Sequence, residues 1–165
     1  MLSDSGATKT GHSLHVVDDI TPDDCSAGQL AALAKARPWR WMPGKTKIFV
    51  DPTADRDELR SIRIAFPGCT VIRKSKGQLA HSVEYGLRCV NTALRDIDGN
   101  TRLTFSSALP RGPRSLLTSI PKLRRKPSGE PHKDNTTDHV GLDCLRYPVA
   151  HLLPLQAGGI TTIRR

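Results

Sequence analysis

The chain has 165 residues, enough for one domain, and only 4% of them are aromatic, so its core must be built from Val, Ile, Leu and Ala. Its four cysteines are scattered without a C-x-x-C pair, which argues against a zinc site and against a disulfide framework. No apolar run approaches the roughly 18 residues of a membrane span, and the polar, acidic start does not read as a signal peptide, so we expect a cytosolic protein with no membrane partner.

Charge is distributed unevenly along the chain. The net charge is +9, but residues 1–30 hold five Asp and one Lys, whereas residues 31–165 hold 24 Lys and Arg against 11 Asp and Glu. A basic body of this kind indicates either a polyanionic partner, most often nucleic acid, or simply a basic, soluble surface. Charge alone does not choose between these two interpretations.

Strand and helix patterns alternate along the chain. A strand is predicted over 13–20, a helix over 26–36 and a strand over 45–50. The capping-box spacing of Asp55 and Glu58 then starts a helix that Pro67-Gly68 ends. Further on, the patterns predict a strand over 69–73, a helix over 79–94, a strand over 101–106 and a helix over 137–153 that is bent at Pro148.

These elements predict a single domain over residues 1–156. It has an irregular start over 1–12, a mobile basic loop over 111–136 and a tail over 157–165. Because strands alternate with helices, we expect an α/β layered fold with parallel strand pairs.

Asp51 directly follows the apolar strand residues Ile48, Phe49 and Val50. One interpretation is a metal ligand at the carboxyl end of a strand, where α/β folds place their sites. The other is an Asp-Pro turn that leads the chain into the next helix.

The helix predicted over 137–153 carries a second group of candidates. His139 and Asp143 lie four residues apart, hence on one helix face, which suits a divalent metal, and Asp138 lies beside them. In the alternative interpretation Asp138 is an N-terminal cap and Asp143 pairs with Arg146. Gly141 inside this helix indicates close approach of another backbone.

Basic residues form two candidate phosphate-binding groups. The first follows a strand and consists of Arg73, Lys74 and Lys76. The second lies in the Pro-rich loop and consists of Lys122, Arg124, Arg125 and Lys126. The alternative is a solvated charge cluster for the first group and a disordered charged loop for the second. The segment from Gly6 to Ser13 nearly spells a phosphate loop, but His12 replaces the required Lys, so we interpret it as a polar segment.

Several segments match one family in order and spacing across roughly residues 13–153. They are Asp51-Pro52-Thr53-Ala54-Asp55, Phe66-Pro67-Gly68, Arg73-Lys74-Ser75-Lys76-Gly77, Tyr85-Gly86-Leu87-Arg88-Cys89-Val90, Asp98-Gly99 with Arg102-Leu103, and Asp138-His139 with Asp143-Cys144-Leu145-Arg146-Tyr147. Together they resemble the C-terminal nuclease domain of the large terminase subunit of tailed bacteriophages.

The resemblance implies a ribonuclease-H-like mixed sheet flanked by helices. It also implies a Mg²⁺- or Mn²⁺-dependent endonuclease that cuts concatemeric DNA during genome packaging in the host cytoplasm. Asp51 and Asp143 match metal-binding acids of the family, with Asp138 or His139 beside them. Double-stranded DNA, a terminase ATPase domain, the small terminase subunit and the portal protein are the implied partners.

The chain departs from the family at its start. The family's first acid lies on an opening central strand, in a G-x-D-x-G-like segment. One interpretation takes Asp4-Ser5-Gly6 as a displaced version of that segment. The flanking residues do not read as a strand, however, so we predict that the opening strand is missing. The alternative function is therefore a truncated, catalytically inactive DNA-binding remnant of the same fold.

Overall fold

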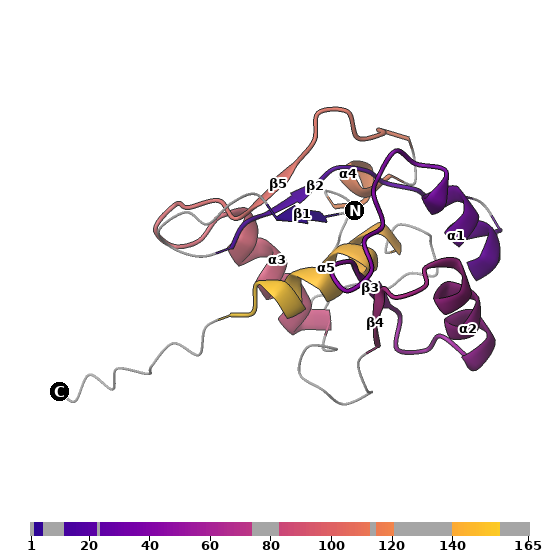
Figure 1. Cartoon of the computed structure of the whole chain (residues 1–165). Coiled ribbons are helices and arrows are strands. Elements are labelled where there is room, and N and C mark those ends of the chain that lie inside the picture. Colours follow the sequence, from indigo (N-terminus) through magenta and orange to yellow (C-terminus); the bar gives the residue numbers. More distant parts are fainter. Residues whose placement is uncertain are drawn as a thin grey trace, which may run out of the picture.

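The computed structural model describes residues 2–4, 12–22, 24–73, 83–112, 115–120 and 140–155. Its elements in chain order are β1 (Leu2–Asp4), β2 (Leu14–Val16), α1 (Ala27–Lys35), β3 (Lys47–Val50), α2 (Arg56–Ala65), β4 (Thr70–Arg73), α3 (Val83–Leu94), β5 (Leu103–Phe105), α4 (Leu116–Ser119) and α5 (Val140–Leu152). The fold is mixed α/β, as predicted (Figure 1). Within the described ranges, no helix is long and apolar enough to cross a membrane.

The strands form two small sheets. The first has the order β1-β2-β5, in which β2 runs parallel to β5 with Leu14 opposite Leu103. The second consists of β3 and β4, also parallel, with Lys47 opposite Thr70. The expected parallel strand pairs are therefore confirmed. The single sheet that the family resemblance implied is divided in two over the part of the chain that the structure describes.

The predicted start of the chain needs a correction. Leu2–Asp4 form β1, which pairs antiparallel with β2 so that Leu2 lies opposite Val16 and Asp4 opposite Leu14. The prediction of an irregular start is thus wrong for residues 2–4, because pairing with β2 creates a strand that the local sequence does not announce. Residues 5–11 lie outside the described ranges.

The helices predicted after residue 26 and after Asp55 both form, and both begin with a side-chain cap. Ser26 caps α1 and Asp55 caps α2, each in a reciprocal capping box with the residue three positions later. Gly68 follows α2 with a φ of +75°, a backbone conformation that favours glycine, so the Pro-Gly stop works as predicted. These helices pack against each other beside β3 and β4 (Figure 1).

The core lies between the first sheet and the helix pair α3 and α5 (Figure 1). Helices α3 and α5 approach closely because Gly86 leaves room for the side chain of Arg146: a Cβ at Gly86 would lie 3.2 Å from its Cβ. The buried residues of this core are Leu14, Val16, Cys89, Val90, Ala93, Leu103, Leu109, Leu116, Leu145, Val149, Ala150 and Leu153.

The basic segment over 111–136 is also not a loop throughout. Residues 116–119 form α4, and Leu116 is buried against α5. A Cβ at Gly141 would lie 3.2 Å from the Cα of Leu116, so the predicted close backbone approach at this glycine is confirmed. The loop prediction is wrong here because packing against α5 outweighs the Pro-rich composition of the segment.

Candidate functional site

Asp51 lies at the carboxyl end of β3, in a turn that its own side chain stabilises. Its Oδ1 accepts hydrogen bonds from the backbone N and the Oγ1 of Thr53. This is the geometry of an Asx-turn, so the turn interpretation of Asp51 is confirmed. The carboxylate is exposed, however, and its Oδ2 faces a group from another element.

Asp143 on α5 forms an ion pair with Arg146 one helical turn later. The Nε of Arg146 donates to Oδ1 of Asp143, and the two side chains are 4% and 30% exposed respectively. The alternative interpretation of Asp143, a helical ion pair, is therefore confirmed. A guanidinium this deeply buried needs such an anion, because an uncompensated charge is costly in the interior.

Tyr147 joins the two acids into one network. Its hydroxyl donates to Oδ2 of Asp51 over 3.1 Å and accepts from Nη2 of Arg146 over 2.9 Å. The guanidinium carbon of Arg146 lies 4.2 Å from the centroid of the Tyr147 ring. Asp51, Tyr147, Arg146 and Asp143 thus form a continuous hydrogen-bonded chain, which we call the acid network.

The acid network shifts the pKa of Asp51 downward. Partial burial by itself raises this pKa, but the hydrogen bonds from Thr53 and Tyr147 and the positive charge of Arg146 outweigh it. Asp51 is consequently held as a carboxylate, which is the form that a metal ion or a hydrogen-bond donor requires.

The pKa of Tyr147 is shifted upward. Burial raises its pKa first, and the carboxylates of Asp51 and Asp143 add to this effect, whereas Arg146 lowers it; the result is a pKa of about 12. The phenol therefore stays protonated near neutral pH and acts as a hydrogen-bond donor to Asp51.

The donor set of the acid network fits a hard cation only in part. Carboxylate oxygens suit Mg²⁺ or Mn²⁺, and Asp51 and Asp143 provide them. Three donors already bind Asp51, and Arg146 occupies an oxygen of Asp143. Among the described residues, no group of three or more His, Cys, Asp and Glu side chains is arranged to hold a metal ion.

Most other predicted site residues lie outside the described ranges. These are Asp138, His139, Lys74, Lys76, Lys122, Arg124, Arg125 and Lys126. Arg73 is described: it ends β4, is exposed, and its Nε donates to the backbone oxygen of Pro52 over 3.1 Å. Arg73 therefore lies next to the Asp51 turn.

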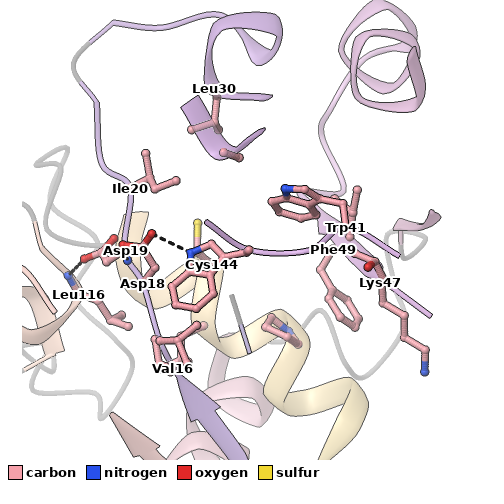
Figure 2. A pocket seen from close by; sticks show the side chains of 18 of the residues that line it. Val16, Asp18, Asp19, Ile20, Leu30, Trp41, Lys47, Phe49, Leu116 and Cys144 are labelled. Carbon is pink, nitrogen blue, oxygen red and sulfur yellow. Dashed lines mark hydrogen bonds between the residues drawn. The ribbon is translucent and has the colours of Figure 1, made fainter. Parts of the chain in front are cut away.

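Two acids after β2 serve as structural anchors that the sequence did not identify. The Oδ2 of Asp18 accepts from Nε1 of Trp39 and contacts Nε of Arg37. The Oδ2 of Asp19 accepts from the backbone N of Leu116 over 2.6 Å and so holds the start of α4 (Figure 2). The sequence shows only that both acids directly follow a predicted strand. This position does not identify the groups that Asp18 and Asp19 bind.

An apolar cavity of about 1260 Å³ lies between α5, the residues that follow β2 and the segment that carries Trp41 (Figure 2). Cys144 opens onto it from α5. Burial raises the pKa of this thiol, the carboxylates of Asp143, Asp19 and Asp51 raise it further, and the α-amino group of the chain opposes them. All four cysteines are free thiols in the structure.

Comparisons of this chain with protein families, with curated proteins and with solved structures found no match.

Proposed function

We propose that this chain is a metal-dependent DNA endonuclease domain of the terminase large-subunit type, with a ribonuclease-H-like fold. One observation carries the proposal: Asp51 after β3 and Asp143 on α5, which are distant in sequence, belong to one acid network. Two carboxylates from separate elements are what a nuclease needs to hold divalent cations. The proposed partner is double-stranded DNA, in a packaging complex with an ATPase domain, a small terminase subunit and a portal protein in the host cytoplasm.

Mg²⁺ or Mn²⁺ would be held by Asp51 and Asp143, with Asp138 or His139 as a further ligand. When bound, such ions activate water and stabilise the charge that develops on a phosphodiester. Since Mg²⁺ commonly takes only one or two protein carboxylates and completes its shell with water and substrate phosphate, DNA would supply part of the site. Arg73, beside the Asp51 turn, is suited to contact a neighbouring phosphate.

In this proposal the remaining members of the acid network keep the acids charged and oriented before the metal binds. Arg146 neutralises Asp143, and Tyr147 fixes Oδ2 of Asp51. Metal binding at Asp143 then has to compete with Arg146. The competition predicts weak metal affinity in the absence of DNA, because a cation must displace a charge-assisted hydrogen bond.

The burial of Arg146 favours a second candidate function, a DNA-binding domain that does not cut. A guanidinium that is 4% exposed and paired with Asp143 supplies at this acid the positive charge that a metal ion would otherwise supply. Such a domain would bind duplex DNA through phosphate contacts alone, weakly and without sequence preference.

Calorimetric titration with Mn²⁺ separates the two candidates. The nuclease proposal predicts that the wild-type chain binds Mn²⁺ and that Asp51→Asn weakens binding, whereas Asp57→Asn, which removes an exposed acid of α2, leaves it unchanged. Absence of Mn²⁺ binding to the wild type, or equal binding by both variants, would favour the second candidate.

Plasmid cleavage in Mn²⁺ adds an independent readout. We expect little or no cleavage by the isolated chain, because Asp51 and the Asp138/Asp143 pair provide few carboxylates for two dications. Robust cleavage that Asp4→Ala abolishes would instead identify Asp4, at the end of β1, as the missing acid.

A further inference from the structure

The cavity between α5, the residues that follow β2 and the segment that carries Trp41 is lined mainly by apolar side chains (Figure 2). Its volume of about 1260 Å³ exceeds the roughly 300 to 1,000 Å³ of most ligand sites, so a small molecule fits inside it. Separate elements contribute the apolar lining, which includes Ile20, Leu30, Trp41, Phe49, Pro148 and Leu152.

Part of this lining is open to water rather than packed. Leu30 is 41% exposed. Cys144 is exposed although Gly141 and Pro148, which share its face of α5, are buried. Figure 2 shows the thiol of Cys144 directed into the cavity. An apolar ligand would remove this surface from water, which is favourable in proportion to the area covered.

One wall of the cavity carries positive charge. Arg40, Lys45 and Lys47 line the cavity, and all three are exposed. None of them has a carboxylate partner among the described residues. Figure 2 shows the ammonium group of Lys47 directed away from the middle of the cavity, so this charge lies at its outer edge. We call these three residues the cationic rim.

Two acids lie across the cavity from Lys47, and both are already engaged (Figure 2). Oδ2 of Asp18 accepts from Nε1 of Trp39 and lies 3.3 Å from Nε of Arg37. Oδ2 of Asp19 accepts from a backbone N–H at the start of α4. Asp24, which also lines the cavity, adds one exposed carboxylate. The charge that a ligand would meet is therefore mainly positive.

Contacts with other elements hold the segment that carries the cationic rim in place. Trp41 packs on Phe66 with 4.5 Å between the ring centroids. Gly44, whose φ is +72°, donates its backbone N–H to the backbone oxygen of Gly68 over 2.8 Å. Because this wall is already ordered, a ligand would not have to order it on binding, which favours affinity.

We propose that the cavity binds a small amphipathic anion, namely a long-chain fatty acid in its carboxylate form. Its apolar tail lies over α5, and its carboxylate pairs with the cationic rim at the outer edge. A few charged groups beside an apolar cavity fix the orientation of a ligand in this way. A carboxylate at the edge also keeps part of its hydration, so binding does not bury an unpaired charge. This inference does not rest on the proposed nuclease function.

Tryptophan emission tests the binding. Both tryptophans of the chain, Trp39 and Trp41, line the cavity, so the emission reports on this region alone. The probe is dodecanoate, added to the whole chain below its micelle concentration. Dodecyltrimethylammonium, which has the same tail and the opposite charge, is the matched control. We expect a saturable emission shift with dodecanoate and binding of the control that is weaker by about tenfold or more. Equal affinities, or no saturable shift with dodecanoate, would overturn the proposal.

Substitutions of exposed lysines test the cationic rim. Lys45→Gln combined with Lys47→Gln should weaken dodecanoate binding by about tenfold, because each exposed ion pair makes a modest contribution. Lys35→Gln is the control, since this exposed lysine of α1 does not line the cavity. It should leave the affinity unchanged. Equal affinities of the double variant and the control variant would contradict a carboxylate held by the cationic rim.

Alkylation by iodoacetamide locates the ligand. At a dodecanoate concentration about ten times its Kd, the rate at Cys144 should fall by about tenfold, because only the ligand-free fraction reacts. Cys69, which does not line the cavity, should react at an unchanged rate. An unchanged rate at Cys144 would place the ligand elsewhere and refute the proposal. Neither metal nor DNA takes part in these measurements, so their failure is distinct from a failure of the nuclease proposal.

Discussion

The ion pair between Asp143 and Arg146 should respond asymmetrically to the loss of either partner. Asp143→Asn leaves the guanidinium of Arg146, which is 4% exposed, without its carboxylate. Breaking a buried ion pair in this way costs about 3 to 5 kcal/mol of unfolding free energy. Because Asp143 itself is 30% exposed and the pair is not fully desolvated, we expect a value near the lower end of that range.

The reverse substitution should cost much less. Arg146→Met keeps an apolar stem between α3 and α5 and leaves behind a carboxylate that water can reach, so we expect a loss of about 1 kcal/mol. The double variant should be more stable than Asp143→Asn alone, since it no longer buries a guanidinium that has lost the carboxylate of Asp143. Urea unfolding of the wild type, the two single variants and the double variant measures these free-energy differences, provided that all four proteins share one m-value. A smaller loss for Asp143→Asn than for Arg146→Met would refute the reasoning.

Three further predictions concern packing, titration and DNA. Gly141→Ala should lower the free energy of unfolding by about 1 kcal/mol, because the added Cβ would lie 3.2 Å from the Cα of Leu116. In the control variant Gly28→Ala the added Cβ meets nothing closer than 3.9 Å, so α1 should gain up to about 1 kcal/mol. Urea unfolding measures both changes. The pKa of Tyr147 is higher in the folded chain than in the unfolded chain, so the resulting stabilisation is complete below pH 10.0 and is lost as pH rises to about 12. Tyr147→Phe should therefore flatten the decline of the unfolding free energy between these two pH values. An unchanged slope would contradict the raised pKa of Tyr147. Arg73→Ala should lower the affinity for unrelated duplexes equally and reduce the salt slope by about one, and a sequence-selective loss would exclude a phosphate contact.

Local signals allowed much of the fold to be predicted. The helix after Asp55 begins where the predicted capping box lies, and Gly68 follows the end of α2, because these motifs are satisfied within a few residues. β1 and α4 escaped prediction because both depend on distant partners. β1 forms by pairing with β2, and Asp19 and Gly141 hold the start of α4 in place.

The sequence also predicted part of the candidate site, namely its two acids. Asp51 and Asp143 stand out as acids at a strand end and on a helix face, and both belong to the acid network. The connection through Tyr147 joins residues 96 positions apart, which no local pattern specifies. Their role as metal ligands stays a prediction, as do the roles of Asp138 and His139.

The measurement that tests the central claim most directly is Mn²⁺ binding to the Arg146→Met variant, compared with the wild type and with Arg146→Met combined with Asp51→Asn. If Asp51 and Asp143 form a cation site for which Arg146 competes, removing the guanidinium should tighten Mn²⁺ binding by about tenfold or more, and Asp51→Asn should cancel the gain. Equal Mn²⁺ affinity in the wild type and Arg146→Met would contradict the account, because removing a competing guanidinium from Asp143 has to tighten binding at a site that includes this acid.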